Sequence, residues 1–373
     1  METKIKLIFI APMELPIPAE KGAVEEIIWQ LSQRLKSTYE VNIFNPIVYS
    51  LWGKAIRSLK ILLTRCREVC IVHSHNLYAS TIVSLYNLKF KHILTLHYPP
   101  TVAKSKGRRR LLESILRYLD SLGTIITIPS LYLRGMLREI GVGKAVFMPN
   151  GVDTTMFNPS RRSEELRETL LEGREALIVS VGRIHPDKNQ LALLMALKRL
   201  VYNYNIKSVR LLLIGPTTGV FKGRIKENYY KLLVEYVDKY DLKQYVKFME
   251  LERRRDVARV LASSDIYVHP SKVEVAAPLA ILEAMASKLP VVAFDLPYYE
   301  GYLVNGVNSI LLPVNNVDLL AETLYILLND RSLALKLSQN AYETAINYFS
   351  WDVLSKKYLD FYATLVHQHS GLR

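Results

Sequence analysis

Two cations follow one apolar segment of the sequence within a short polar stretch. Arg183 and Lys188 come after the strand-like run Ala176–Val181 and before a helical pattern, and Gly182 permits a tight turn ahead of them. Two fixed cations in such a place stabilise the negative charge that develops on a departing phosphate group without a metal ion. Cations that flank a turn are also common in proteins without any ligand there, so this pair alone leaves both interpretations open.

Two carboxylates lie near a second apolar segment, Ile266–His269. Glu274 falls in the loop after this segment, and Glu283 lies about one turn inside the helix expected for Leu279–Ala286. Ionised carboxylates accept hydrogen bonds from hydroxyl groups, so two of them beside one cleft suit a sugar or a ribose. The helix dipole also favours a carboxylate near a helix start, which gives one of the two a structural alternative.

Three histidines and one glycine mark the first half of the chain. His97 follows the predicted strand His92–Leu96, where a parallel sheet presents side chains to a ligand, although a lone histidine is more often structural. His73 and His75 share one face of a strand, but no full set of ligands is evident with them and no metal site is predicted. Gly22 lets backbone amides approach a phosphate or a sugar, or simply precedes a helix.

These residues require a scaffold of parallel strands, because apolar runs alternate with helical patterns along the chain. In the first half, strands are predicted at Lys6–Ala11, Val41–Phe44, Val69–His73, His92–Leu96 and Thr124–Ile128, and helices at Ala23–Leu35, Lys54–Cys66 and Arg109–Leu119. In the second half, strands are predicted at Ala176–Val181, Val209–Ile214, Val246–Met249, Ile266–His269 and Val291–Phe294, and helices at Leu191–Tyr204, Leu279–Ala286 and from Val317 onward. Such alternation predicts sheets covered on both faces by helices, with ligands at the carboxyl ends of the strands.

The segment from Pro149 to about Arg174 interrupts this alternation with prolines and a charged stretch, so we expect the interdomain linker there. A chain of 373 residues has room for two domains of about 100–200 residues each. We therefore predict an α/β fold of two doubly wound, Rossmann-like domains that face each other across a cleft. A dinucleotide-binding oxidoreductase is one alternative, but Gly215, Gly219 and Gly223 lack the spacing G-x-G-x-x-G.

Composition and charge limit the class further. Half of the residues are hydrophobic and 23% are charged, as in a globular protein. No run of about 18 apolar residues predicts a membrane-spanning helix, and the first apolar stretch stops at Pro12, which favours a buried strand over a signal peptide. The net charge of +14 favours an anionic partner, which could be nucleotide phosphates, nucleic acid or acidic lipid. Cys66 and Cys70 are interpreted as small buried residues, which fits a reducing, cytoplasmic location.

Four marks, in this order, resemble those of the retaining GT-B glycosyltransferases (glycosyl transferases group 1), the family that includes bacterial lipid mannosyltransferases and sucrose synthases. The marks are Met148–Asp153 with Phe157–Pro159, Val181–Asn189, Pro270–Ala286 and Phe349–Trp351. The resemblance covers nearly the whole chain and is strongest from Pro149 to Pro313. It implies an acceptor-side domain at residues 1–160, a nucleotide-sugar-binding domain at 161–345, and a final helix within 346–373 that crosses back to the first domain.

The resemblance also implies roles for the candidate residues. Arg183 and Lys188 would hold the diphosphate of a UDP- or GDP-sugar donor. Glu283 would bind the nucleotide ribose, and Glu274 would contact the donor sugar near its anomeric carbon. The other expected contacts are His97 beside the donor sugar, Gly22 by the diphosphate, and Pro278 and Leu279 in the donor site. Such hexosyltransferases keep the anomeric configuration, need no metal or other cofactor, and use the leaving phosphate to help deprotonate the acceptor.

The sequence departs from the family pattern in three places. Glu274 and Glu283 have the spacing E-x8-E instead of E-x7-E. Ala276, Ala277 and Pro278 replace a Gly-Phe-Gly segment, and proline has no amide N–H to offer a sugar. The segment from Gly215 replaces a glycine-rich turn. We expect an active enzyme with an unusual donor pocket; the alternatives are a catalytically degenerate partner subunit and a GT-B phosphorylase or epimerase relative.

A basic run precedes an apolar-striped helix in the first half of the chain. Its cations are Lys104, Lys106, Arg108, Arg109 and Arg110. Such a surface binds anionic lipid, with about 1 kcal/mol contributed by each cation, and an ordinary solvated helix face is the alternative. Nucleic-acid binding is not expected, because the run has no aromatic residue for base stacking. We expect a cytoplasmic enzyme, peripheral at the inner membrane face, with a lipid-linked or other glycan acceptor.

Overall fold

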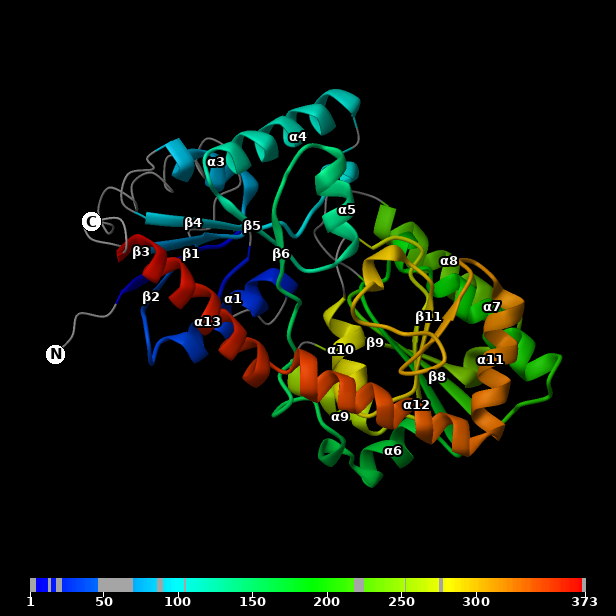
Figure 1. Cartoon of the computed structure of the whole chain (residues 1–373). Helices are drawn as coiled ribbons and strands as arrows, with labels where there is room; N and C mark the ends of the chain where they lie inside the picture. The colour runs from blue at the N-terminus through cyan, green and yellow to red at the C-terminus, as the bar shows by residue number, and fades with distance from the viewer. Residues whose placement is uncertain are drawn as a thin grey trace. The chain divides into compact units, whose positions relative to one another are not determined.

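The computed structural model describes residues 5–12, 15–17, 22–45, 70–85, 90–103, 105–217, 225–251, 253–274 and 278–370. The predicted helix at Lys54–Cys66 and the basic residue Lys104 lie outside these ranges. The described chain divides into two compact units (Figure 1). Unit 1 comprises the described parts of Met1–Gly151 and Trp351–Arg373, and unit 2 those of Val152–Glu274 and Pro278–Ser350.

Unit 1 is built on a parallel sheet with the strand order β2-β1-β3-β4-β5-β6. Its strands are β1 (Lys6–Ile10), β2 (Glu40–Phe44), β3 (Cys70–Ser74), β4 (Phe90–Thr95), β5 (Ile125–Ile128) and β6 (Ala145–Phe147). Its helices are α1 (Ala23–Leu35), α3 (Leu77–Leu85), α4 (Lys106–Ser121), α5 (Tyr132–Glu139) and α13 (Trp351–Ser370). Strand β1 pairs with β2 on one side and β3 on the other, so the strand order reverses between β1 and β3.

The C-terminal helix α13 belongs to unit 1 and packs along α1 (Figure 1). Arg34 Nε lies 3.5 Å from Asp352 Oδ1, and the rings of Tyr39 and Tyr362 meet edge to face at 5.9 Å. At the start of the helix, the Trp351 ring covers Gly151 so closely that a Cβ there would lie 2.6 Å from the indole. These contacts make α13 part of the unit 1 core although it is distant from the rest of that unit in sequence.

Unit 2 is built on a second parallel sheet, with the strand order β12-β11-β10-β7-β8-β9. Its strands are β7 (Ala176–Val181), β8 (Val209–Ile214), β9 (Val246–Met249), β10 (Ile266–His269), β11 (Val291–Phe294) and β12 (Ile310–Leu312). Its helices are α6 (Glu164–Leu171), α7 (Gln190–Tyr202), α8 (Ile225–Lys239), α9 (Arg254–Ala262), α10 (Leu279–Ala286), α11 (Val317–Asn329) and α12 (Arg331–Thr344). Strand β7 lies between β8 and β10, so the order reverses between β7 and β10.

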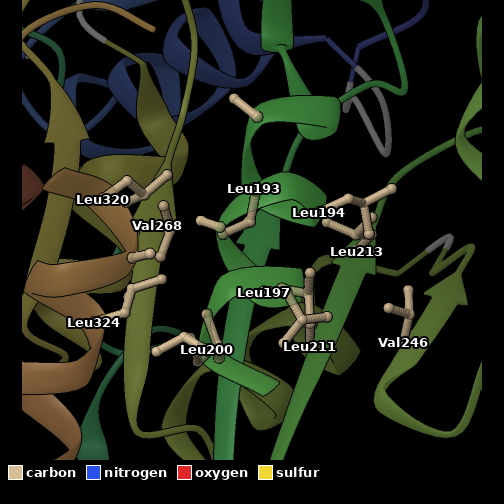
Figure 2. Packing of buried hydrophobic residues seen from close by; sticks show 14 of the residues in the cluster. Leu193, Leu194, Leu197, Leu200, Leu211, Leu213, Val246, Val268, Leu320 and Leu324 are labelled. Atoms are coloured by element: carbon tan, nitrogen blue, oxygen red, sulfur yellow. The ribbon is translucent and has the colours of Figure 1, made fainter. Parts of the chain in front are cut away.

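The core of unit 2 forms because the strands are nearly all apolar and the helices present one apolar face each. Figure 2 shows leucines of α7, among them Leu193 and Leu197, packed with Leu211 of β8, Val268 of β10 and Leu324 of α11. Full burial of a side chain of this size contributes roughly 1.5–3 kcal/mol. The tightly packed sheet thereby gives the loops at its carboxyl ends a rigid support.

The α/β fold predicted from the sequence is confirmed, with parallel sheets in both halves of the chain. None of the helices within the described residues is long and apolar enough to cross a membrane. Cys70 is buried in β3 and is disulfide-bonded, so the expectation of a simple buried thiol is wrong for this residue. Cys66 lies outside the described ranges. Cys70 therefore gives no support to the inference of a reducing location.

Candidate functional site

The loops after β7 and β10 meet at the point where the unit 2 sheet reverses its strand order. In open parallel sheets, the two chains that leave such a point turn to opposite faces and open a crevice at the carboxyl ends of the strands. Arg183 and Lys188 follow β7, and Glu274 follows β10. The amide of Lys272 donates a hydrogen bond to the carbonyl of Asp187 at 3.0 Å, which joins the two loops. The sheet order thus brings these candidates together from distant parts of the sequence.

Two glycines bring the loops after β7 and β8 into direct backbone contact. Gly215 has a φ of 156°, and a Cβ at this position would overlap the carbonyl oxygen of Gly182. A further backbone hydrogen bond runs from Ile184 N to Pro216 O at 3.4 Å. The turn that carries Arg183 is also held by Gln190, whose Nε2 donates to the Arg183 carbonyl at 2.8 Å, while the Arg183 side chain is exposed.

Lys188 and Glu274 form an ion pair in which Glu274 Oε1 accepts from Lys188 Nζ. The Glu274 side chain is 9% exposed and that of Lys188 is 18% exposed. Burial raises the pKa of Glu274, but the hydrogen bonds from His269 and Lys188, together with the Lys188 charge and the charge that His269 carries when it is protonated in acid, outweigh burial and lower this pKa to about 2. Glu274 is therefore an ionised carboxylate at neutral pH, with acceptor capacity only.

A second side chain holds the same carboxylate. His269, the last residue of β10, lies with Nε2 2.8 Å from Glu274 Oε1 and with Nδ1 2.9 Å from the hydroxyl of Tyr267. Burial lowers the pKa of His269, although Glu274 opposes this shift, so we take its ring as neutral at pH 7. Neither His269 nor Tyr267 had been assigned a role from the sequence; a polar pair within an otherwise apolar strand is the signal that could have found them.

Glu283 lies one turn inside α10 and is buried, with an exposed fraction of 6%. Arg254, at the start of α9, donates from Nη2 to Glu283 Oε1 at 2.6 Å, and its guanidinium lies over the ring of Phe157. Pro278 precedes α10, and its backbone is extended there. Leu279, the first residue of the helix, is buried. Arg254 is the second of three consecutive arginines, and this run is the sequence feature that could have pointed to it, although no role was predicted for it.

In unit 1, His97 is linked to His75 at the carboxyl ends of β4 and β3. His97 Nε2 lies 2.8 Å from His75 Nδ1, and both rings are buried. His75 also stacks on His73, with ring centroids 4.5 Å apart. These strands lie beside the reversal of the unit 1 sheet, where Gly22 also lies in the segment between β1 and α1. His75 is thus held by His97 through Nδ1 and by stacking on His73.

The buried histidines continue into a hydrogen-bonded chain that reaches helix α13. His73 Nδ1 lies 2.6 Å from the Tyr362 hydroxyl, and His73 Nε2 lies 2.6 Å from Thr95 Oγ1. Burial lowers the pKa of His97 to about 4 and that of His73 to about 3, with neighbouring histidines adding to the second shift. The cluster is therefore uncharged at neutral pH, and His97 is a neutral hydrogen-bonding group.

Gly22 has a φ of 116° and directly precedes α1, which is a backbone conformation that favours glycine. The first turn of α1 carries Glu25 and Glu26, and both are buried. A Cβ on Gly22 would lie 2.5 Å from a carboxylate oxygen of Glu25. Carboxylates in this turn occupy the positive end of the helix dipole, which works against a second anion there. The contact of Gly22 with a diphosphate stays a prediction.

No group of three or more His, Cys, Asp or Glu side chains suited to a metal ion occurs in the part of the chain that the structure describes. Of the predicted donor-site residues, Arg183, Lys188, Glu274, Pro278, Leu279 and Glu283 all belong to the loops or helix at the carboxyl end of the unit 2 sheet. Gly22 and His97 belong to unit 1.

The fold and these loop positions define an α/β protein of GT-B glycosyltransferase architecture. The chain is similar to sucrose-phosphate synthase from Thermosynechococcus elongatus, with a TM-score of 0.81, 18% sequence identity and coverage of 98% of this chain and 100% of that one. It is also similar to HepE from Anabaena in complex with UDP-glucose, with a TM-score of 0.75, 17% identity and coverage of 96% and 100%. At these identities the likeness shows the fold alone.

Family models and relatives identify the chain more closely. Residues 161–344 match the model of Glycosyl transferases group 1, and residues 18–156 match that of Glycosyltransferase Family 4. These matches confirm the resemblance to glycosyl transferases group 1 found in the sequence, and the protein is a glycosyltransferase. A relative from Escherichia coli, UDP-Gal:alpha-D-GlcNAc-diphosphoundecaprenol alpha-1,3-galactosyltransferase, is 24% identical over 84% of this chain and 80% of its own length. The phosphatidyl-myo-inositol mannosyltransferase of Mycolicibacterium smegmatis is 26% identical over 80% and 71%.

Proposed function

We propose that the protein is a retaining glycosyltransferase that moves a hexose from a UDP- or GDP-sugar to a lipid-linked or other glycan acceptor, without a metal or other cofactor. The observation that carries the proposal is the meeting of Lys188 and Glu274 at the reversal of the unit 2 sheet. The Lys188 ammonium, which can bind a diphosphate, and the Glu274 carboxylate, which can accept from sugar hydroxyls, lie side by side there. The names of two relatives, with a UDP-galactose donor and a diphosphoundecaprenol-linked acceptor in one of them, support the substrate classes.

The chemistry follows from these charges. The bond between the anomeric carbon and the diphosphate oxygen breaks, and both electrons stay on the diphosphate. Lys188 and Arg183 neutralise the added charge, which is the work that a metal ion does in other enzymes. The acceptor oxygen bonds to the anomeric carbon on the face that the diphosphate leaves, and its proton passes to a diphosphate oxygen. Glu274 and Glu283 hold the sugar and the ribose by hydrogen bonds.

A donor screen tests the proposal. The protein is incubated with UDP-galactose, UDP-glucose, UDP-N-acetylglucosamine and GDP-mannose in the presence of EDTA, and release of nucleoside diphosphate is followed. We expect slow hydrolysis of one donor without an acceptor, at a rate that EDTA does not change, and proton NMR of the early sugar product should show the anomer of the donor. A strict metal requirement contradicts the metal-independent mechanism. Binding of a donor with no turnover under any condition favours the degenerate-subunit alternative.

We further propose that the acceptor is reached at an anionic, cytoplasmic membrane face. Helix α4 begins with exposed cations at Lys106, Arg108, Arg109 and Arg110, capped by Ser105, which accepts from the Arg108 amide at 3.3 Å. Leu111 and Tyr118 of the same helix are exposed large apolar residues, while Leu116 and Leu119 are buried. Cations next to exposed apolar side chains are the composition of a helix that rests on acidic lipid.

A further inference from the structure

A chain of buried side chains ends at Glu274, the carboxylate assigned above to the donor sugar. Tyr267 and His269 are two residues apart in β10, so they share one face of the strand, and their rings are stacked with centroids 6.1 Å apart. The hydroxyl of Tyr267 lies 2.9 Å from His269 Nδ1, and His269 Nε2 lies 2.8 Å from Glu274 Oε1. Tyr267 and His269 are 0% and 2% exposed.

These contacts permit one arrangement of protons when His269 is neutral. An ionised Glu274 can only accept, so the proton of His269 is on Nε2 and is donated to Oε1. Nδ1 is then a bare lone pair, and it accepts from the Tyr267 hydroxyl. Burial raises the pKa of Tyr267 well above its ordinary value, so this hydroxyl keeps its proton. Both ring nitrogens of His269 and the Tyr267 hydroxyl are therefore paired, and the tautomer of His269 is fixed.

Lys188 also donates to Glu274 Oε1, but this contact does not hold the carboxylate when a donor is bound. A bound diphosphate, with more than one negative charge, draws the Lys188 ammonium away from a single carboxylate. His269 has no such competitor, because its second nitrogen is occupied by Tyr267 and its ring is enclosed by Tyr267 and by the edge-to-face ring of Tyr299 at 6.3 Å. When Lys188 binds the donor diphosphate, His269 is the group that keeps Glu274 in place.

We propose that His269, supported by Tyr267, is a positioning residue that holds Glu274 Oε1 and thereby aims the second oxygen, Oε2, at a hydroxyl of the donor sugar. The described residues provide no hydrogen bond to Oε2. This inference rests on the proposed function, because it assigns the Glu274 carboxylate to a nucleotide-sugar. It explains how a carboxylate in an irregular loop, five residues beyond the strand, acquires a defined direction from the rigid sheet.

The experiment distinguishes contacts with the donor sugar from contacts with the nucleotide. Isothermal calorimetry measures binding of UDP, UDP-glucose, UDP-galactose, GDP and GDP-mannose to the wild type and to three variants. His269→Leu removes the hydrogen-bond donor to Oε1, and His269→Gln places an amide nitrogen where Nε2 was. Tyr267→Phe keeps the ring and removes the hydroxyl. Thermal unfolding of each variant is measured alongside.

We expect His269→Leu to weaken binding of the nucleotide-sugar at least tenfold and to change binding of the free nucleoside diphosphate less than twofold. His269→Gln should recover most of the loss, and Tyr267→Phe should weaken nucleotide-sugar binding about threefold, by a hydrogen bond of roughly 0.6 kcal/mol. An equal loss for nucleotide and nucleotide-sugar in folded variants, or a Gln variant as weak as the Leu variant, overturns the positioning role. If the wild type binds the nucleotide but no nucleotide-sugar in the set, and hydrolyses none, it is the proposed function that fails.

Discussion

Lys188 and Glu274, to which the family resemblance assigns different parts of one donor, form an ion pair with each other. Under the proposed function, a donor phosphate takes the place of the carboxylate beside Lys188, and a sugar hydroxyl takes the place of the ammonium beside Glu274. The pair stabilises two charges that are largely removed from water, and an unpaired charge in such a site is costly. A donor that bridges both groups exchanges one ion pair for two charge-assisted contacts.

Replacement of Lys188 by alanine tests this exchange. Lys188→Ala removes the ammonium group and leaves His269 as the hydrogen-bond partner of the Glu274 carboxylate among the described residues. We expect affinity for the free nucleoside diphosphate to fall about tenfold to hundredfold, which corresponds to one charge-assisted contact of roughly 1.5–3 kcal/mol. Calorimetry with UDP and GDP measures the loss.

The matched control for this variant is Lys207→Ala. Lys207 is an exposed lysine of the same unit, in the turn between α7 and β8, so its loss changes the net charge equally. Nucleotide affinity should be unchanged in this control. A Lys188→Ala protein that binds UDP and GDP as tightly as the control does would place the diphosphate elsewhere.

Gly215 is the second position where a small change should have a large effect. Gly215→Ala places a methyl group on the carbonyl of Gly182 at a φ of 156°, so the loops after β7 and β8 must separate. We expect the free energy of unfolding to fall by about 3 kcal/mol. Gly173→Ala is the control, because Gly173 also has a positive φ, of 81°, but no atom within 4 Å of the added Cβ. This control should lose about 1 kcal/mol, from backbone strain alone. Urea titrations that give both variants the same midpoint would show that the contact of the two glycines is not required.

The strands and several helices of unit 2 could be predicted because their pattern is local. The runs Ala176–Val181, Val209–Ile214 and Ile266–His269 are strands with the predicted bounds, since a strand buried on both faces is continuously apolar. Strand β6 was not predicted, because its three residues are only partly buried and carry no apolar run of useful length. Helix α9 was not predicted, because it is only nine residues long and its first turn is charged, although Val257, Val260 and Leu261 have helical spacing.

The partners within the candidate site could not be predicted from these patterns. His73 bonds Tyr362, which is 289 residues away in the sequence, and Lys188 bonds Glu274 at a separation of 86. Residue spacing identifies neighbours on one strand or helix only. For His73 and His75 it therefore offered a metal site or a structural role, without the partners that distinguish the two. Sheet order and the return of α13 to unit 1 decide these pairs, and neither follows from local periodicity.

The buried histidines predict a loss of stability in mild acid. Burial lowers the pKa of His92 to about 3, so the folded protein keeps this ring neutral while the unfolded chain takes up a proton below its ordinary pKa of about 6.5. The unfolded state therefore binds more protons as the pH falls from 6.5 toward 3, and its stability relative to the folded state increases. For one such histidine the cost at pH 5 is about 2 kcal/mol.

Urea unfolding at pH 7.5 and pH 5, followed by tryptophan fluorescence, measures this loss. Asparagine at position 92 keeps a hydrogen-bonding group near Nδ1, which lies 3.1 Å from Thr124 Oγ1, but it does not titrate. His92→Asn should therefore reduce the difference between the two pH values by about 2 kcal/mol. Most carboxylates stay ionised across this range, so they do not obscure the comparison. Equal pH dependence in both proteins would mean that His92 is protonated in the folded state.

The cations of α4 predict a charge-dependent affinity for lipid. Arg109 forms an ion pair with Glu113 at 2.7 Å, whereas Arg108 Nη2 donates to the uncharged hydroxyl of Tyr78 at 3.4 Å. The charges of Arg108 and Arg110 are therefore better placed to meet lipid phosphates. Arg108→Ser with Arg110→Ser should weaken binding to vesicles that contain 30% anionic lipid by roughly 2 kcal/mol, or about thirtyfold. Vesicle sedimentation at about 0.1 M salt measures this change, with neutral vesicles in parallel.

Lys356→Ser with Lys357→Ser supplies the comparison for net charge, since both lysines are exposed on α13 and their loss removes two positive charges far from α4 in the sequence. A protein attracted to lipid only by its net charge of +14 should respond equally to both pairs of substitutions. A protein that docks through α4 should respond to the arginine pair alone, because cations act on a membrane surface within about one Debye length, roughly 10 Å at this salt concentration. Sedimentation that does not depend on lipid charge at all would remove the membrane from the proposed function and leave a glycan acceptor in solution.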